Sequence, residues 1–548
     1  MPSWQDIAAA KRADLEAKIA ATGFKAPKVP PETLNVTGVS LNGVLSANEL
    51  SITGSAVEEV LEKLRSGEWT SEEVVRAFCK RAVIAHELTN CLTDIYYDRA
   101  LERAKALDGE MARTGKPVGP LHGLPISLKN QVNVEGEEMN FGYVGWAGRI
   151  AQKNAVIVDC LLKQGAVIYC YTNVPQALMS GETHCHLYGR TVNPHQRQLA
   201  PGGSSGGEGA LIAMRGSLLG VGSDIGGSIR QPSAFNGLYG FRPSWRRLPY
   251  GDATNSMEGF EAVPSVLGPM SASLSGLRTF FKAVIDAEPW RLDPLNLHMP
   301  WNDDAYQLIE HGGGQGPLCF GFNLHNGIAK PAPPYLRAMD ELKKALVGMG
   351  HKVVNYSPPD ASTGVDLLFS LWVADGGEDI KRQCALSGEP VMSGALKGQE
   401  MPHLSTYDFW QLCLKRRNWI REQLRAWEAT EQITGTGRPI DAIIAPAAAY
   451  PSFRHGDQQD IFYHGLSNIC DYPTAVFPVT TVNPALDVKA PAHNFASDFD
   501  KHNYESYDPD VFRDVPIGLQ VYARKGEDEA TLKFVEICDE ALKAMRLE

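Results

Sequence analysis

The hydrophobic and polar positions of the first third of the chain predict helices. Thr70 is followed three positions later by Glu73, which is the pattern of a capping box at a helix start. Apolar residues follow at 74, 75, 78, 79 and 82, at the spacing of one helix face. We expect a second helix from about Asp98 to Arg113.

The pattern then alternates between strands and helices. Apolar residues at 124, 126 and 128 alternate with Pro125, Ser127 and Lys129, as in a half-buried strand, so Lys129 points away from the apolar face. A helix is expected over 154–164 and a strand over 166–171, with Gly165 ending the helix.

The same mixture returns late in the chain. Strand-like segments at 442–445, 475–479 and 517–521 precede an amphipathic helix from about 528 to 545. We therefore predict an α/β fold with a mixed central β-sheet sandwiched by helices. We expect residues 1–60 to form an N-terminal helical arm and 61–548 one catalytic domain, with a less regular insertion or cap around 289–435.

Composition adds limits on partners and location. The chain has 548 residues with 43% hydrophobic content, which suits a globular protein with a large core. A net charge of −12 argues against nucleic acid as a partner. We see no signal-peptide core and no membrane span. Ten cysteines lie singly, without a CxxC pair, which favours a reducing, cytoplasmic location.

Two clusters of glycine and serine stand out, at 201–208 and 221–230. The first matches G-x-S-x-G around both Ser204 and Ser205, which is the pattern of an α/β-hydrolase nucleophile elbow. An elbow needs an apolar strand directly before it, whereas residues 193–201 are polar and bounded by prolines. Taken alone, this cluster also fits a flexible loop.

The second cluster fits acyl transfer. Consecutive backbone N–H groups of Ile225, Gly226, Gly227 and Ser228 can converge on one anionic oxygen, and a nucleophile at Ser228 would lie beside that site. A tight turn before a helix is the alternative. The nucleophile needs a base, and the candidates are other hydroxyl groups and Lys129. Lysine acts as a base only when neutral, which burial favours; a surface lysine is the alternative.

Taken together, these motifs resemble the amidase signature family. The resemblance rests on Gly123–Lys129, Thr172–Gln176, Gly202–Gly207, Asp224–Arg230 and Pro516–Gln520, in that order. It covers the chain from about residue 60 to the C-terminus. In motif detail the chain is most similar to fungal acetamidase-type enzymes. Asn130 departs from the family, since many members carry Asp after the lysine.

The resemblance implies a Ser-Ser-Lys triad. Ser228 would be the acylated nucleophile, Ser204 a bridging serine that usually follows a cis peptide bond, and Lys129 the terminal base. Ser205 would support them, and Leu178 would border the substrate carbonyl. Asp224 and Arg230 would hold the geometry of the loop between them.

The implied function is hydrolysis of carboxylic acid amides through an acyl-enzyme, without a cofactor. Alternatives are an ester or carbamate hydrolase, an amidotransferase subunit, and a scaffold without activity. The partner would be a small amide, and a homodimer is a family-level expectation. We do not expect a metal site at His184-Cys-His186, because no further ligand pattern supports one. An apolar acyl pocket would draw on aromatic residues of the cap: Phe369, Trp372, Phe409 and Trp410.

Overall fold

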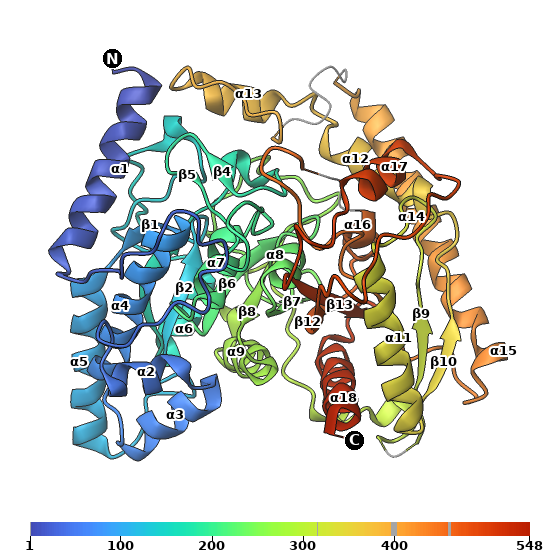
Figure 1. Cartoon of the computed structure of the whole chain (residues 1–548), viewed down its shortest axis with the longest axis horizontal. Helices are drawn as coiled ribbons and strands as arrows, with labels where there is room; N and C mark the ends of the chain where they lie inside the picture. Colours follow the sequence, from blue (N-terminus) through green and yellow to red (C-terminus); the bar gives the residue numbers. More distant parts are fainter. Residues whose placement is uncertain (1, 315, 396–402, 459–461, 548) are drawn as a thin grey trace.

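The computed structural model describes residues 2–314, 316–395, 403–458 and 462–547, and its centre is one mixed sheet (Figure 1). The described residues form 11 strands in this sheet, in the order β1-β3-β2-β6-β8-β7-β12-β13-β11-β9-β10. Its strands are β1 (Leu92–Ile95), β2 (Pro125–Lys129), β3 (Val167–Thr172), β6 (Leu219–Asp224), β7 (Tyr239–Arg242), β8 (Val266–Ser271), β9 (Cys319–Phe322), β10 (Lys352–Asn355), β11 (Ala442–Pro446), β12 (Thr474–Thr481) and β13 (Pro516–Tyr522). A separate short hairpin pairs β4 (His184–Cys185) with β5 (Gly189–Arg190).

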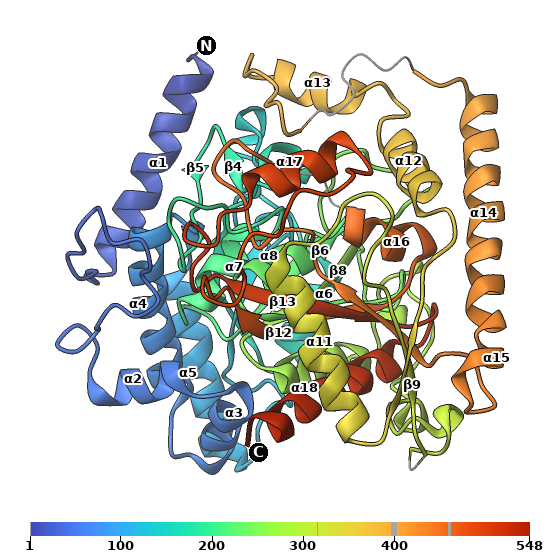
Figure 2. The same ribbon diagram turned by 45° about the vertical axis from the view of Figure 1, so that its right-hand side comes forward.

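Helices surround the sheet, with α1, α4 and α5 along one side of the molecule and α14 along the other (Figures 1 and 2). The helices before β9 are α1 (Trp4–Ala21), α2 (Ala47–Gly54), α3 (Val57–Ser66), α4 (Ser71–Thr89), α5 (Tyr97–Thr114), α6 (Val156–Lys163), α7 (Gly206–Ala213), α8 (Arg230–Phe235), α9 (Leu274–Asp286) and α10 (Asp303–Tyr306). Those after β9 are α11 (Pro333–Gly348), α12 (Ala361–Trp372), α13 (Glu378–Ala385), α14 (Thr406–Ala429), α15 (Glu431–Thr434), α16 (Phe462–Cys470), α17 (Asp498–Ser506) and α18 (Asp528–Leu547).

The predicted α/β class and its mixed sheet between helices are confirmed. The capping box is present, since the Thr70 side chain accepts from the Glu73 N–H and Glu73 accepts from the Thr70 N–H. Helices α5, α6 and α18 and strands β3, β11, β12 and β13 fall where the pattern predicts them.

The prediction of a half-buried strand at 124–129 was wrong, because all five residues of β2 are buried. Strand β2 lies inside the sheet between β3 and β6, parallel to both. Its apolar face joins the main core through Ile126 and Leu128. Its other face carries Ser127 and Lys129, which α7 and the loop before it cover. The alternation of apolar and polar residues therefore predicted which side chains share a face, but not that both faces are buried.

The predicted N-terminal arm and the predicted cap region both contain regular secondary structure. Helix α1 packs beside β1, where Lys18 Nζ lies 2.8 Å from a carboxylate oxygen of Asp94. Segment 289–435 contributes β9, β10 and α11 to the sheet and its cover, so much of its described part is more regular than we expected. The division into an arm, a domain and a cap stays a prediction. No helix in the described ranges has the length and apolar character needed to cross a membrane.

Candidate active site

The candidate site lies where two parallel strands end. Strands β2 and β6 pair in parallel, with Leu128 opposite Val221, so their carboxyl ends meet at one edge of the sheet. Lys129 is the last residue of β2 and Asp224 is the last of β6. The two glycine-rich loops reach the same edge, one leading into α7 and the other into α8. Helix α7 and strand β6 occupy the sequence between Ser204 and Ser228.

Lys129 is completely buried at this edge. Its Nζ donates hydrogen bonds to Ser204 Oγ at 2.7 Å and to Ser223 Oγ at 2.8 Å. Burial lowers the pKa of Lys129 to about 7, because removal from water disfavours the ammonium form, while the charges of Asp224 and Glu208 oppose this change. A sizeable neutral fraction of Lys129 is therefore available near neutral pH.

The Gly203–Ser204 peptide bond is cis. Glycine is required beside it, since a Cβ on Gly203 would lie 2.5 Å from the carbonyl oxygen of Ser180. The loop is anchored on both sides: the Thr183 hydroxyl donates to the Gly202 carbonyl at 2.9 Å, and the Gly203 N–H donates to Gln231 Oε1 at 3.2 Å. These bonds hold the Ser204 hydroxyl against Lys129.

Ser228 lines a pocket and is 9% exposed, compared with 1% for Ser204. Its carbonyl oxygen accepts from the Ser205 N–H at 3.1 Å, and the Ser205 hydroxyl contacts the backbone of Ser223 at 3.4 Å. Ser205 thus ties the two loops together. The side chains of Ser204 and Ser228 share no hydrogen bond in this structure. Catalytic hydrogen bonds often tighten only when substrate binds.

The loop between β6 and α8 is held by a buried ion pair. Arg230 Nε and Nη2 each donate to a carboxylate oxygen of Asp224 at 3.0 Å, and both side chains are fully buried. The Arg230 charge lowers the pKa of Asp224 against the opposing effect of burial. Asp224 also accepts from the N–H of Gly227 at 2.9 Å and of Ile229 at 3.2 Å, so the carboxylate shapes the whole turn.

One N–H group of the predicted oxyanion site already has an acceptor within this turn. The Gly227 N–H is already bonded to Asp224, so it is not available to substrate in this structure. Among the described residues, the N–H groups of Ile225, Gly226 and Ser228 have no acceptor, and these three residues line the pocket. Three of the four expected donors therefore remain.

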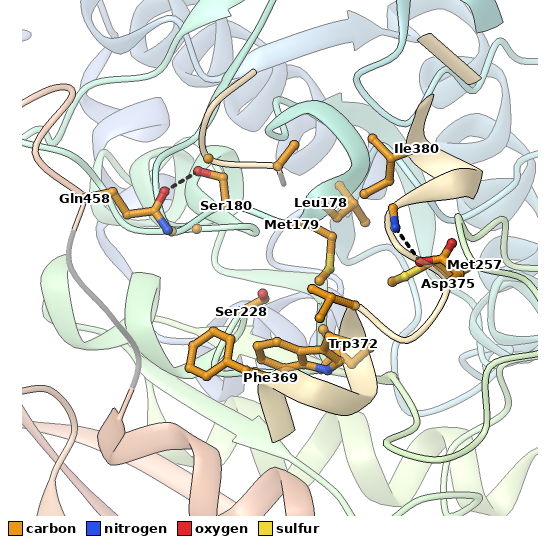
Figure 3. A pocket seen from close by; sticks show the side chains of 18 residues that line it. Leu178, Met179, Ser180, Ser228, Met257, Phe369, Trp372, Asp375, Ile380 and Gln458 are labelled. Atoms are coloured by element: carbon orange, nitrogen blue, oxygen red, sulfur yellow. Dashed lines mark hydrogen bonds between the residues drawn. The ribbon is translucent and has the colours of Figure 1, made fainter. Parts of the chain in front are cut away.

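The pocket beside Ser228 is small and mainly apolar (Figure 3). Its volume is about 80 Å³. Leu178, Phe369 and Trp372 contribute to its walls, and α12 and α13 of the predicted cap therefore cover the site. The other two aromatic candidates do not line it: Trp410 is 62% exposed on α14, and Phe409 packs in the same apolar cluster as Phe369 and Trp372 but lies outside the pocket wall.

The comparisons with known proteins agree with this geometry. A family model described as Amidase matches residues 73–532. The chain belongs to the amidase family. It is 40% identical over 536 residues to an acetamidase of Emericella nidulans, covering 97% of each chain. It is also 40% identical to an acetamidase of Aspergillus oryzae, covering 97% of this chain and 98% of the relative. These matches confirm the resemblance to the amidase signature family and its fungal acetamidase-type members.

A solved structure of a fatty acid amide hydrolase has the same fold as this amidase. The two superpose with a TM-score of 0.90 at 30% identity, covering 98% of this chain and 95% of the other. Family membership makes the protein a hydrolase that acts on amides.

Sequence reasoning missed two polar residues of the amidase site. Ser223 is the second hydroxyl partner of Lys129, and its place directly before Asp224 at the end of a strand was the available signal. Glu208 is fully buried on α7, and its position in an otherwise glycine-rich and apolar segment was the signal. A charged residue in such a segment must find polar partners inside the core.

Asn130, which departs from the family pattern, has a structural role here. Its Oδ1 accepts from the N–H groups of Asn140 at 3.0 Å and Phe141 at 3.3 Å, and its Nδ2 donates to Thr93 Oγ1 at 2.8 Å. The amide supplies both a donor and an acceptor, whereas an ionised carboxylate only accepts. Asn130 therefore connects the end of β2 to two neighbouring segments.

Proposed function

We propose that this amidase cleaves its substrates through a Ser-Ser-Lys relay and an acyl-enzyme on Ser228. The observation that carries the proposal is the buried Lys129, whose Nζ lies 2.7 Å from Ser204 Oγ at the edge of the pocket that Ser228 lines. A lysine in contact with water would stay protonated at neutral pH and could not accept a proton.

In the first step, neutral Lys129 takes the proton of Ser204, and Ser204 takes that of Ser228 as Ser228 Oγ attacks the amide carbonyl carbon. The N–H groups of Ile225, Gly226 and Ser228 stabilise the developing oxyanion. The proton returns through Ser204 to the leaving nitrogen as the C–N bond breaks. Water, deprotonated by the same base, then attacks the acyl-enzyme and releases the acid and free Ser228.

We propose short amides with an apolar acyl group as the preferred substrates. A volume of about 80 Å³ leaves little room beside Ser228, and the walls formed by Leu178, Phe369 and Trp372 offer apolar contact. The names of the two acetamidase relatives support this size class. Longer acyl chains would need a change in the walls of the pocket.

The decisive test is labelling with a serine-directed fluorophosphonate, read by intact-protein mass spectrometry. We expect one adduct on the wild type and none on Ser228→Ala, with release of ammonia from acetamide reduced by about a thousandfold or more in the variant. Ser180→Ala is the matched control, because Ser180 lines the same pocket but has no role in the relay.

Two outcomes would contradict the proposal. Labelling that persists in folded Ser228→Ala would place the nucleophile elsewhere. A folded wild type that neither labels nor releases ammonia from any amide of a panel of short and long acyl chains would remove the acyl-enzyme mechanism altogether.

A further inference from the structure

A second buried charge lies near the relay but has no part in it. Glu208 lies in the first turn of α7, and its side chain is completely buried. Its carboxylate accepts from Ser127 Oγ at 2.6 Å and from Thr172 Oγ1 at 2.9 Å. Gly220 on β6 makes room for it, since a Cβ there would lie 2.0 Å from Glu208 Oε2. The fold therefore places this carboxylate at a defined position in the sheet.

That position is on the Lys129 side of the sheet. Ser127 and Lys129 are two residues apart on β2, so their side chains point to the same face. Thr172 is the residue of β3 that pairs with Lys129 in the strand register. Both hydroxyl groups that hold Glu208 are therefore neighbours of Lys129, and all four side chains are fully buried.

Two carboxylates lie near Lys129: Asp224 is paired with an arginine, whereas Glu208 is not. Asp224 forms its ion pair with Arg230 at 3.0 Å. Among the described residues, Glu208 forms no ion pair with any lysine, arginine or histidine. Lys129 is thus the cation that the Glu208 carboxylate faces across the site.

The remaining titratable groups packed around α7 do not change this balance. Cys91, Tyr169 and Cys170 lie close enough to interact with Glu208, and burial raises the pKa of each, so all three stay neutral. Arg81 from α4 reaches only the far end of α7, where its Nε donates to the Met214 carbonyl at 2.9 Å.

We propose that Glu208 is a positioning residue for the base Lys129. The carboxylate of Glu208 sets the pH at which Lys129 loses its proton. This inference rests on the proposed function of Lys129. Burial raises the pKa of Glu208 to about 7 and lowers that of Lys129 to about 7, so both groups change charge in the same pH range, and each charge favours the ionised form of the other. The negative charge favours the ammonium form of Lys129, and its loss makes the neutral base easier to reach.

The test is the pH profile of kcat/KM for acetamide in the wild type and in Glu208→Gln. The glutamine keeps the shape and removes the charge; its Oε1 accepts from one of the two hydroxyl groups, and its Nε2 donates to the other, which then acts as the acceptor. We expect the acid limb to move to lower pH by about one unit, while the plateau above it is retained. A merely structural role would lower the plateau or the folded fraction and leave the midpoint of the limb in place.

Two further variants complete the test. Glu208→Asp keeps the charge but withdraws it by one methylene, so its limb should lie between those of the wild type and Glu208→Gln. Ser217→Ala is the matched control, because it removes the hydroxyl that contacts Ser127 Oγ at 3.0 Å and changes no charge; its limb should not move.

The outcomes separate this inference from the proposed function. A wild type that hydrolyses amides with no acid limb contradicts the lysine base itself. A wild type with an acid limb, together with an unmoved limb in folded Glu208→Gln, overturns only the role of Glu208. If the glutamine variant does not fold, Glu208→Asp replaces it in the test. An acid limb of Glu208→Asp that coincides with that of the wild type then also overturns the role of Glu208.

Discussion

At the scale of single residues, the site depends on what burial does to a lysine. Lys129 has no exposed surface, and within the described part of the chain its Nζ forms hydrogen bonds with two hydroxyl groups alone. Neither Ser204 nor Ser223 supplies a charge that would hold the ammonium form. The same side chain on the surface would be a cation with no capacity to act as a base. The chemistry therefore follows from the position of the residue rather than from its type.

The rate should fall as pH decreases through the pKa of Lys129. The base acts in its neutral form, and burial lowers its pKa to about 7, so the neutral fraction dominates above that pH and is lost below it. We expect kcat/KM for acetamide to fall about tenfold per pH unit below the midpoint. Lys129→Ala should lose activity at every pH. A wild-type rate that stays constant down to about pH 5, the range of carboxylates, would contradict a lysine base.

At the scale of elements, the turn between β6 and α8 determines where the N–H groups proposed to bind the oxyanion point. Asp224 binds two N–H groups of this turn and the guanidinium of Arg230, and Arg230 in turn donates to the His464 carbonyl at 3.1 Å on α16. Gly227 has a φ of +111°, which glycine tolerates best. The ring of His464 packs against it, so a side chain has no space there.

Gly227→Ala should therefore damage catalysis. An added Cβ would lie 2.5 Å from His464 Cγ, so the turn must shift and its N–H groups move away from the oxyanion position. We expect kcat/KM to fall by roughly a hundredfold. Gly259→Ala is the matched control, since Gly259 also has a positive φ, +87°, but a Cβ there meets nothing within 4 Å.

This control separates the effect of backbone strain at a positive φ from the effect of the steric clash with His464. Gly259→Ala should cost about 1–2 kcal/mol of stability by thermal denaturation and leave kcat/KM unchanged. Equal kinetic effects of the two alanines would show that the contact with His464 has no special role in the turn.

At the scale of the whole molecule, the pocket is assembled from distant parts of the chain. Leu178 and Ser228 come from the first half, whereas Phe369 and Trp372 come from α12 (Figure 3). The catalytic edge is built by β2 and β6, which lie near one end of the sheet, and α12 reaches it from the side where α14 packs. The walls of the pocket are therefore formed in part by residues outside the sequence motifs.

Trp372→Ala should enlarge the pocket and change the preference for acyl length. We expect the ratio of kcat/KM for hexanamide over acetamide to rise about tenfold or more, because each additional methylene that the pocket accepts contributes about 1 kcal/mol or more. Trp410→Ala is the matched control, as this exposed tryptophan lies outside the pocket. A ratio that changes equally in both variants, or in neither, would mean that Trp372 does not limit acyl length.

The sequence by itself determined several of the elements, the fold class and the family. Capping residues, periodicity and glycine positions act locally, so Thr70 and Glu73 could be assigned to a helix start and Lys129 to one face of a strand. The order of the motifs carried the resemblance from which the triad residues were taken, and the family match confirms that resemblance.

Only the tertiary structure decided what depends on the neighbours of a residue. Burial of both faces of β2, the hydrogen bond from the Gly227 N–H to Asp224, and the contact of Ser223 with Lys129 all depend on how the chain folds around these residues. The choice of Phe369 and Trp372 over Phe409 and Trp410 as pocket walls is of the same kind. Pairing and desolvation are properties of the packed chain, so residue type and spacing do not reveal them.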